Sequence, residues 1–132
     1  MSRETDRGSG ILHKSGEDYL EAVLVLSLSN GEVRPIDIAN YLNYSRPSVT
    51  SAVALLKQSG YLTIDERHHI DLTEAGRNIA EEIYNRHRFF RDFLVKAGAD
   101  PERAEEDACR MEHAISAESF GHLKRYLEST GL

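Results

Sequence analysis

A pair of short helices separated by a tight turn constrains the fold of this chain most. Residues 35–42 carry an apolar face at helical spacing, and Pro35 suits a first helical turn. Ser45 is the predicted N-cap of the next helix, which has Pro47 in its first turn and ends at Gly60. Two such helices joined by a tight turn form a helix-turn-helix.

The residues that follow this pair predict a β-hairpin. Residues 61–64 and 69–72 each alternate apolar and polar side chains, and the polar residues 65–68 connect them. A hairpin placed directly after a helix-turn-helix is the wing of a winged-helix domain. Winged helices bind DNA in many proteins, but some are protein-interaction modules, so the fold alone leaves both functions open.

Helical periodicity predicts one more helix before this region and three after it. Ser15 is the expected N-cap of the first helix, with Asp18 three residues later as in a capping box. Thr73, Asp100 and Ser116 are the expected N-caps of the three C-terminal helices. The predicted fold class is therefore mainly α, with a small β-hairpin as its only sheet.

Composition restricts where the protein works. The chain has 132 residues and one cysteine, so it can form no internal disulfide, which suits a reducing cytoplasm. No apolar run approaches the roughly 18 residues that cross a membrane, and the N-terminus has no apolar core of a secretory signal. We predict a cytoplasmic protein without a membrane partner.

Charge is distributed unevenly for a DNA-binding chain. The formal net charge is −6; residues 31–72 carry 4 basic and 5 acidic side chains, whereas residues 73–132 carry 9 and 12. Phosphate contacts dominate affinity for nucleic acids, so an acidic chain needs help from dimerisation, helix N-termini or bound cations.

Candidate DNA-binding residues lie at the start of the second helix of the helix-turn-helix, which enters the major groove in such folds. Short hydroxyl side chains there let the backbone approach the duplex and bond to phosphates or base edges. The alternative is that these small residues merely cap a surface helix. The candidates are Ser45, Arg46, Pro47, Ser48, Thr50 and Ser51, with Lys57 and Arg67 as phosphate contacts.

A cysteine, a glutamate and a histidine lie close together in the C-terminal part. On a helix, Cys109, Glu112 and His113 are at positions i, i+3 and i+4, and therefore share one face. Thiolate, carboxylate and imidazole together suit a divalent transition metal. A structural zinc site would show more sulfur and paired cysteine spacing. The competing interpretation is a packed cysteine beside a surface glutamate and an unrelated histidine.

Five stretches of the chain, in the same order, resemble motifs of the diphtheria-toxin-repressor family of metal-dependent regulators, including its manganese-transport-regulator branch. They cover the start of the first helix, the recognition helix, the junction after the wing, a histidine step on the long helix and the metal-binding helix. The stretches are residues 17–21, 45–53, 72–76, 85–88 and 107–113.

This resemblance implies a metal-gated, homodimeric repressor that binds operator DNA and controls metal-homeostasis genes. It also implies three domains: a flexible arm over 1–14, the winged helix-turn-helix over 15–72, and a helical metal-binding and dimerisation domain over 73–132. No room remains for the SH3-like domain of the longer family members. The metal ligands carried over from the family are Asp18, Glu21, His87, Cys109, Glu112 and His113.

The ligand set mixes two branches of the family. Asp18 matches the manganese-type members, whereas Cys109 matches the iron-type members. Arg91 and Glu105 stand where iron-type members carry the glutamate and histidine of an ancillary site, so a standard ancillary site is not expected. A thiolate favours Fe²⁺ over Mn²⁺, with Zn²⁺, Co²⁺ and Ni²⁺ able to bind in vitro.

Two other functions remain open from the sequence. A metalloenzyme would need an open metal position, a substrate pocket and a nearby acid or base, and the chain shows no phosphate loop or nucleophile motif. We therefore predict no enzyme and no small-molecule substrate. A winged-helix regulator that senses an organic ligand, with Cys109 simply packed, is the second alternative.

An apolar stripe on the last helix, with Phe120, Leu123 and Leu127, fits either a dimer interface or the internal core.

Overall fold

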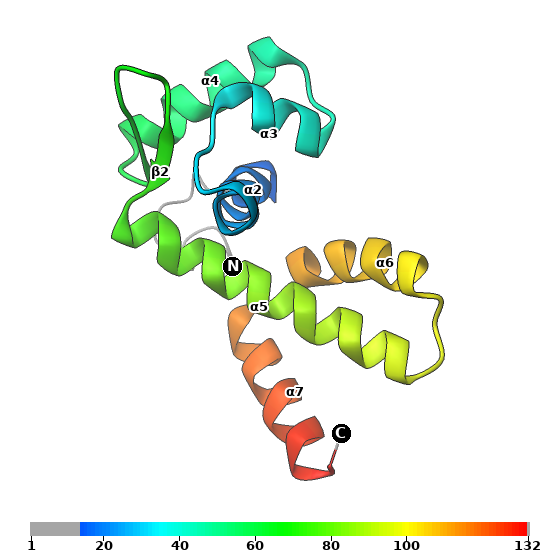
Figure 1. Cartoon of the computed structure of the whole chain (residues 1–132). Helices are drawn as coiled ribbons and strands as arrows, with labels where there is room; N and C mark the ends of the chain where they lie inside the picture. Colours follow the sequence, from blue (N-terminus) through cyan, green and yellow to red (C-terminus); the bar gives the residue numbers. More distant parts are fainter. Residues whose placement is uncertain (1–13, 132) are drawn as a thin grey trace. The chain divides into compact units, whose positions relative to one another are not determined.

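The computed structural model describes residues 14–131 (Figure 1). Its elements in chain order are α2 (Lys14–Asn30), α3 (Pro35–Leu42), α4 (Arg46–Gln58), β1 (Leu62–Ile64), β2 (Ile70–Leu72), α5 (Glu74–Lys96), α6 (Pro101–Ala114) and α7 (Ala117–Ser129). They form two compact units, and the chain passes from the first to the second between Glu81 and Glu82, within α5. The predicted mainly helical fold with a winged helix-turn-helix is confirmed.

Helix α2 provides the core of the N-terminal unit. Its apolar face holds Leu20, Ala22 and Val23, each at most 1% exposed, and it contacts α3, α4 and β2. Burying one Leu or Val side chain contributes roughly 1.5–3 kcal/mol, so this face holds the helix-turn-helix and the hairpin together.

The turn between α3 and α4 forms as its residue types predict. Asn43 adopts the left-handed conformation (φ 60°) that ends α3, which an asparagine tolerates better than most residues. Ser45 is the N-cap of α4, because its Oγ accepts a hydrogen bond from the backbone N–H of Ser48 at 3.2 Å. Pro47 lies in the first turn of α4, where its missing N–H costs nothing.

The predicted hairpin is present, with a short two-stranded ladder. The antiparallel register pairs Leu62 with Leu72 and Ile64 with Ile70. The backbone N–H of Ile70 also donates to the carbonyl of Val33 at 2.7 Å, which ties the hairpin to the segment between α2 and α3. Because Leu62 and Ile70 are both buried, the wing is anchored to the core at its base.

The junction between the hairpin and α5 is tightly packed. Thr73 caps α5 as predicted: its Oγ1 accepts from the Gly76 N–H at 3.1 Å and donates to the Gly60 carbonyl at 2.7 Å. A Cβ atom built on Gly76 would overlap the Tyr61 carbonyl oxygen, well inside van der Waals contact. The backbone of α5 can therefore approach the end of α4 this closely only with glycine at position 76.

The C-terminal unit consists of the second part of α5 with α6 and α7. Asp100 and Ser116 cap α6 and α7 as predicted, each accepting a hydrogen bond from a backbone N–H three residues on. Phe89, Phe90 and Phe120 meet edge to face, with ring centroids 5.3–5.7 Å apart. This aromatic cluster joins α7 to α5.

Two predictions at the N-terminus have different outcomes. The N-cap predicted at Ser15 is wrong, because α2 already includes Lys14 and Ser15 lies within the helix. A serine one residue inside a helix start presents the same sequence pattern as an N-cap, and such boundaries are ambiguous by one or two residues. Residues 1–13 of the predicted flexible arm lie outside the described part of the chain. No helix among the described residues is long and apolar enough to cross a membrane.

Candidate metal centre and DNA-binding face

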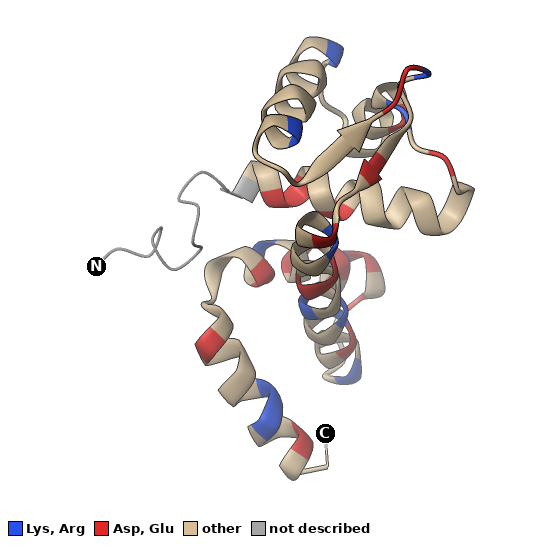
Figure 2. Cartoon of the chain, turned by 90° about the vertical axis from the view of Figure 1, so that its left-hand side faces the viewer, with Lys and Arg blue, Asp and Glu red and all other residues tan. Residues whose placement is uncertain are grey.

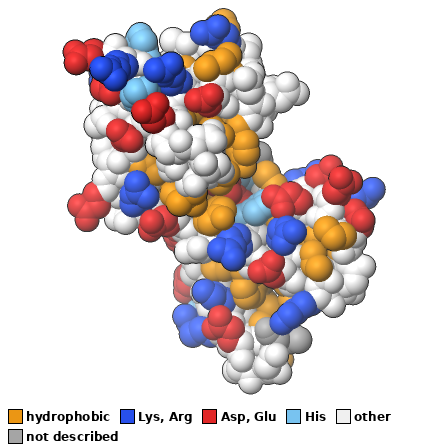
Figure 3. All heavy atoms as spheres, viewed as in Figure 1, with side chains coloured by type: hydrophobic (Ala, Val, Ile, Leu, Met, Phe, Trp, Pro, Cys, Tyr) orange, Lys and Arg blue, Asp and Glu red, His pale blue; other side chains and the backbone are white. Residues whose placement is uncertain are grey.

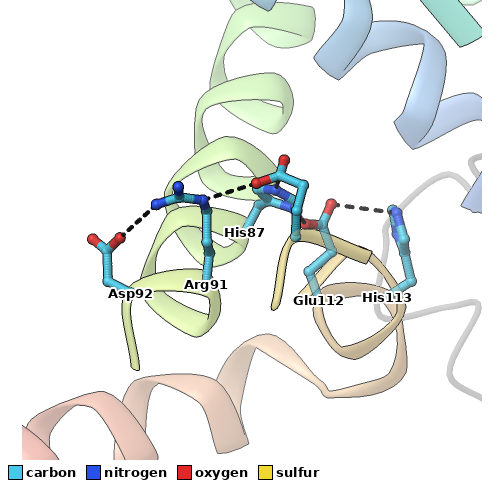
Figure 4. A network of polar contacts seen from close by, with 6 residues as sticks. His87, Arg91, Asp92, Glu112 and His113 are labelled. Atoms are coloured by element: carbon cyan, nitrogen blue, oxygen red, sulfur yellow. Dashed lines mark hydrogen bonds and ion pairs between the residues drawn. The ribbon is translucent and has the colours of Figure 1, made fainter. Parts of the chain in front are cut away.

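Polar side chains from α5 and α6 meet inside the C-terminal unit (Figure 4). His87 lies on α5 and bonds to α6 through both ring nitrogens. Its Nδ1 is 2.7 Å from Oε1 of Glu112, and its Nε2 is 2.7 Å from Oε2 of Glu105. Two short charge-assisted hydrogen bonds from one imidazole therefore join α5 to α6 around His87.

Glu112 is the most unusual residue of this cluster, because its side chain is fully buried (0% exposed). Its Oε2 has no hydrogen-bond partner among the described residues; Nε2 of His113 lies 3.3 Å away without hydrogen-bond geometry. Burying a carboxylate oxygen without a hydrogen bond is costly, since such groups are normally hydrogen-bonded or paired with a cation or a metal. This oxygen is therefore suited to a bound cation.

The two carboxylates change the protonation of His87. The hydrogen bond to Glu112, and then the one to Glu105, raise the pKa of His87 from 6.5 to about 9, although burial acts in the opposite direction. The imidazole is therefore protonated on both nitrogens at neutral pH. Its positive charge balances part of the buried negative charge.

Cys109 and His113 form the second part of the cluster on α6. They are four residues apart, and the thiol sulfur and one imidazole nitrogen lie within 4.8 Å of each other. Cys109 is half-buried, and the side chain of His113 is only 5% exposed. Glu112 is instead grouped with His87, and its Oε2 lies 3.3 Å from Nε2 of His113. The predicted convergence of all three α6 side chains on one ion therefore stays a prediction.

Arg86 fixes the end of α6 that carries Glu112 and His113. Its side chain is buried, and Nη1 donates to the backbone carbonyls of Glu112 at 3.0 Å and Ile115 at 3.1 Å. A guanidinium at the C-terminus of a helix satisfies carbonyls that have no partner within the helix. Arg86 was part of a motif in the sequence, but this structural role was not predicted from it.

The other two predicted ligands, Asp18 and Glu21, belong to the N-terminal unit. They are three residues apart on α2 and so face the same side of that helix. Asp18 is 8% exposed and Glu21 is half-buried. The neighbouring Glu17 is buried as well, at 3% exposed, so this part of α2 carries several shielded carboxylates, which are uncommon unless they are paired.

The predicted DNA-binding residues are exposed in the N-terminal unit, but they line two different hollows: Pro47, Ser48 and Ser51 line one beside α2, and the others that line a hollow face the wing. All eight, from Ser45 to Arg67, are exposed, and α4 carries Arg46 and Lys57 but no acidic residue (Figure 2). A groove of about 550 Å³ runs between α4 and the wing, and its charged lining is basic. That lining consists of Arg34, Arg46, Lys57 and Arg67, together with His68.

Arg34 was missed by the sequence analysis. It precedes Pro35 in the chain, yet its Nη2 reaches Nε2 of His69 in the wing at 3.0 Å, and basic and histidine side chains gather there (Figure 3). At the tip of the wing, Asp65 accepts hydrogen bonds from the backbone N–H groups of His69 at 2.9 Å and Arg67 at 2.8 Å. These bonds, led by the one from His69, lower the pKa of Asp65 and close the turn.

Comparison with known proteins decides the family. Residues 12–70 match the model of the iron dependent repressor N-terminal DNA-binding domain, and residues 73–130 match that of the iron dependent repressor metal-binding and dimerisation domain. The chain belongs to the iron-dependent repressor family. The candidate cluster of α5 and α6 lies in the segment that matches the metal-binding and dimerisation model, and the candidate DNA-binding residues lie in the segment that matches the DNA-binding model.

Individual relatives agree with this assignment. The repressor is 34% identical over 119 residues to an uncharacterized HTH-type transcriptional regulator of Methanocaldococcus jannaschii, covering 89% of this chain and 95% of that protein. It resembles the crystal structure of T. acidophilum IdeR, with 30% identity and a TM-score of 0.75, and the structure of the manganese regulator SloR, with 26% identity and a TM-score of 0.75. The matches cover 88% and 86% of this chain, which spans about half the length of those two chains (54% and 53%). The family consists of transcriptional regulators rather than enzymes, as predicted.

The residues of this repressor fit a divalent cation. The buried Glu112 presents an oxygen without a hydrogen bond and is grouped with the imidazole of His87, while the thiol of Cys109 is grouped with the imidazole of His113. Imidazole and thiolate donors suit a first-row transition metal better than Ca²⁺ or Mg²⁺.

Proposed function

We propose that this protein is a repressor whose binding to operator DNA requires a divalent transition metal, with Fe²⁺ as its physiological ion. One observation carries the proposal: the carboxylate of Glu112 is fully buried with one oxygen lacking a hydrogen bond. In the same chain, a winged helix-turn-helix exposes a basic groove. A metal centre and a DNA-binding face in one small protein are what a metal-gated regulator needs.

The proposed ligands come from both units. Cys109, Glu112 and His113 on α6 and His87 on α5 supply sulfur, oxygen and nitrogen. Asp18 and Glu21 on α2 supply further carboxylates, as the family resemblance implies. A metal ion bound by all of them would supply the positive charge that offsets these carboxylates. The ligands therefore span the first helix, the long helix and the metal-binding helix.

Gating follows from where the carboxylates lie in the chain. The family resemblance implies that the carboxylates of α2 and α6 share a cation, so without it they would repel each other and the protein would sample several conformations. Helix α2 is also the core of the DNA-binding unit, so fixing α2 fixes the recognition helix. In a dimer, the two recognition helices must match major grooves roughly 34–36 Å apart.

Dimerisation is proposed through α7. None of its residues is fully buried, although Phe120 packs on Phe89 and Phe90. Leu123 and Leu127 are only half-buried, and Leu127 lines an apolar hollow of about 460 Å³. A second copy covering this stripe would bury it, in keeping with the matched dimerisation domain.

The choice of Fe²⁺ depends on Cys109. A thiolate ligand favours Fe²⁺ over Mn²⁺, whereas Mn²⁺ is better served by carboxylate and imidazole. Asp18 favours Mn²⁺ by resemblance, and both iron-dependent and manganese regulators are among the relatives of this chain. Mn²⁺ is therefore the alternative ion.

The gating proposal is tested by anaerobic titration of the protein against a pseudo-palindromic operator, once in chelator and once in excess Fe²⁺ or Mn²⁺. Tight binding is expected only with metal, and Cys109→Ala should remove this difference. Arg46→Ala serves as the control, because it should weaken DNA binding and leave metal affinity unchanged. Equal operator affinity in chelator and in metal would contradict the proposal.

The choice of ion is tested with Cys109→Glu. In the wild-type protein, half-maximal operator binding should need less free Fe²⁺ than free Mn²⁺. Replacing the thiolate with a carboxylate should move this preference toward Mn²⁺, because the soft ligand is lost. If the ratio of the two midpoints does not change, Cys109 does not select the ion.

A further inference from the structure

Glu105 and Arg91 lie beside the proposed metal centre, and neither is among its proposed ligands. Glu105 accepts a hydrogen bond from Nε2 of His87 at 2.7 Å through Oε2. Its other oxygen, Oε1, lies 2.9 Å from Nε of Arg91. The three side chains therefore form a chain of contacts from Arg91 through Glu105 to His87 (Figure 4).

The spacing of these residues along α5 and α6 lets one carboxylate contact both other side chains. His87 and Arg91 are four residues apart on α5, so both face α6 from consecutive turns. Glu105 projects from the first half of α6 and bridges them, using one carboxylate oxygen for each. Glu112 is two turns further along α6 and faces the opposite ring nitrogen of His87.

The chemistry of histidine explains why this arrangement matters for metal binding. A neutral imidazole binds a metal through one nitrogen and keeps a proton on the other. Ligating histidines usually donate that proton to a carboxylate or carbonyl, which fixes the tautomer and the ring orientation. In this protein Nε2 meets Glu105, so Nδ1 is the nitrogen left to face the buried oxygens of Glu112.

We propose that Glu105, anchored by Arg91, is a positioning residue that orients His87 so that Nδ1 is presented to the cation. This inference rests on the proposed function, because it concerns the same metal centre. Arg91 is the anchor in this arrangement: its guanidinium lies 2.9 Å from Oε1 of Glu105 and holds this carboxylate where Oε2 accepts from Nε2 of His87.

Arg91 provides a test because two explanations of its role predict opposite changes in the affinity for a cation. If Arg91 acted only through its charge, removing it would relieve repulsion and strengthen cation binding. If Arg91 positions Glu105, removing it frees Glu105 and misorients His87, so cation binding weakens. If Glu105 were a latent ligand, removing Arg91 would instead add a second binding event.

The experiment is calorimetric titration of the full chain with Mn²⁺ and with Co²⁺, alongside the ligand-field absorption spectrum of the Co²⁺ complex. Arg91→Met should raise the Kd about tenfold without a second binding event, and Glu105→Ala should raise it 10- to 100-fold, the range for partners of ligating histidines. Glu105→Gln should recover part of the loss, because its amide oxygen can still accept from Nε2. Both Glu105 variants should shift the Co²⁺ spectrum.

Matched controls separate positioning from general charge and from folding. Arg88→Met removes the same charge from the same helix at an exposed position, and Glu106→Gln is the exposed neighbour of Glu105; neither should change the Kd or the Co²⁺ spectrum. Circular dichroism should show a folded protein in each case, since Arg91 and Glu105 are 42% and 55% exposed.

The possible failures are distinguishable. If the wild-type chain binds neither Mn²⁺ nor Co²⁺, the proposed function fails and this inference fails with it. If the wild-type chain binds but Arg91→Met binds equally well, more tightly or with a second ion, the inference alone is overturned. An unchanged spectrum and Kd in Glu105→Ala would also overturn it.

Discussion

Replacing Glu112 with glutamine is expected to abolish metal-dependent operator binding. The buried carboxylate supplies the oxygen that lacks a hydrogen bond, and it is the group that His87 faces from α5. An amide is neutral and a weak metal ligand. Losing a residue that only hydrogen-bonds to a ligand lowers metal affinity by about 10- to 100-fold. Losing Glu112, a ligand itself, should therefore lower the affinity for Fe²⁺ or Mn²⁺ by more than about 100-fold. Calorimetric titration measures this loss directly.

Thermal unfolding provides the second measurement for Glu112→Gln. A ligand that binds only the native state stabilises it by about 2.7 kcal/mol at a concentration of 100 times its Kd. Wild-type protein should therefore unfold at a higher temperature when Mn²⁺ is added, whereas the variant should not respond. Glu106→Gln, on the exposed side of the same helix, is the control and should behave as wild type. A full response of Glu112→Gln to Mn²⁺ would remove Glu112 from the ligand set.

Gly76→Ala is expected to destabilise the DNA-binding unit by about 3 kcal/mol or more. The added Cβ would overlap the backbone oxygen of Tyr61, and a backbone atom cannot move aside as a flexible side chain can. The start of α5 would have to shift away from the end of α4, breaking the contacts of Thr73 that join them. Adding a methyl group to a packed site typically costs about 1–3 kcal/mol of stability. A clash with backbone should cost at least the upper value of this range, because the backbone cannot move aside easily. Urea unfolding of the metal-free protein measures the loss.

Gly121→Ala is the matched control, because the same change is made inside another helix. A Cβ atom at this position would meet only the Arg125 side chain, at an ordinary contact distance of 3.5 Å. Alanine is the better helix former by roughly 1 kcal/mol, so this variant should be as stable as wild type or more stable. Destabilisation of similar size in both variants would show that the contact with Tyr61 is not the cause.

Local features of the sequence predicted the elements well. The N-caps at Ser45, Thr73, Asp100 and Ser116, and the alternation of residues in the hairpin, all act within a few residues along the chain. The physical causes of these features are hydrogen bonds to a helix end and the period of a strand, which need no knowledge of distant contacts. The one wrong cap, at Ser15, concerned a helix start, where several polar residues satisfy the same rule.

The arrangement of the candidate metal ligands could be predicted only in part. The i, i+3, i+4 spacing of Cys109, Glu112 and His113 is a local signal, and His87 came from the resemblance to the family. Neither source showed that Glu112 would be fully buried with one oxygen lacking a hydrogen bond. Burial is the sum of contacts from several elements, so spacing along one helix does not predict it.

The chain therefore specified its helices, its wing and most candidate ligands through short-range patterns. Only the packing of α5 against α6 brought Glu105 between His87 and Arg91, and only the fold aimed Arg86 at the carbonyls that end α6. These pairs are 14 to 29 residues apart in sequence. Their meeting depends on the angle and register at which two helices pack, which is decided by apolar contacts along the whole interface and not by the residues that bond.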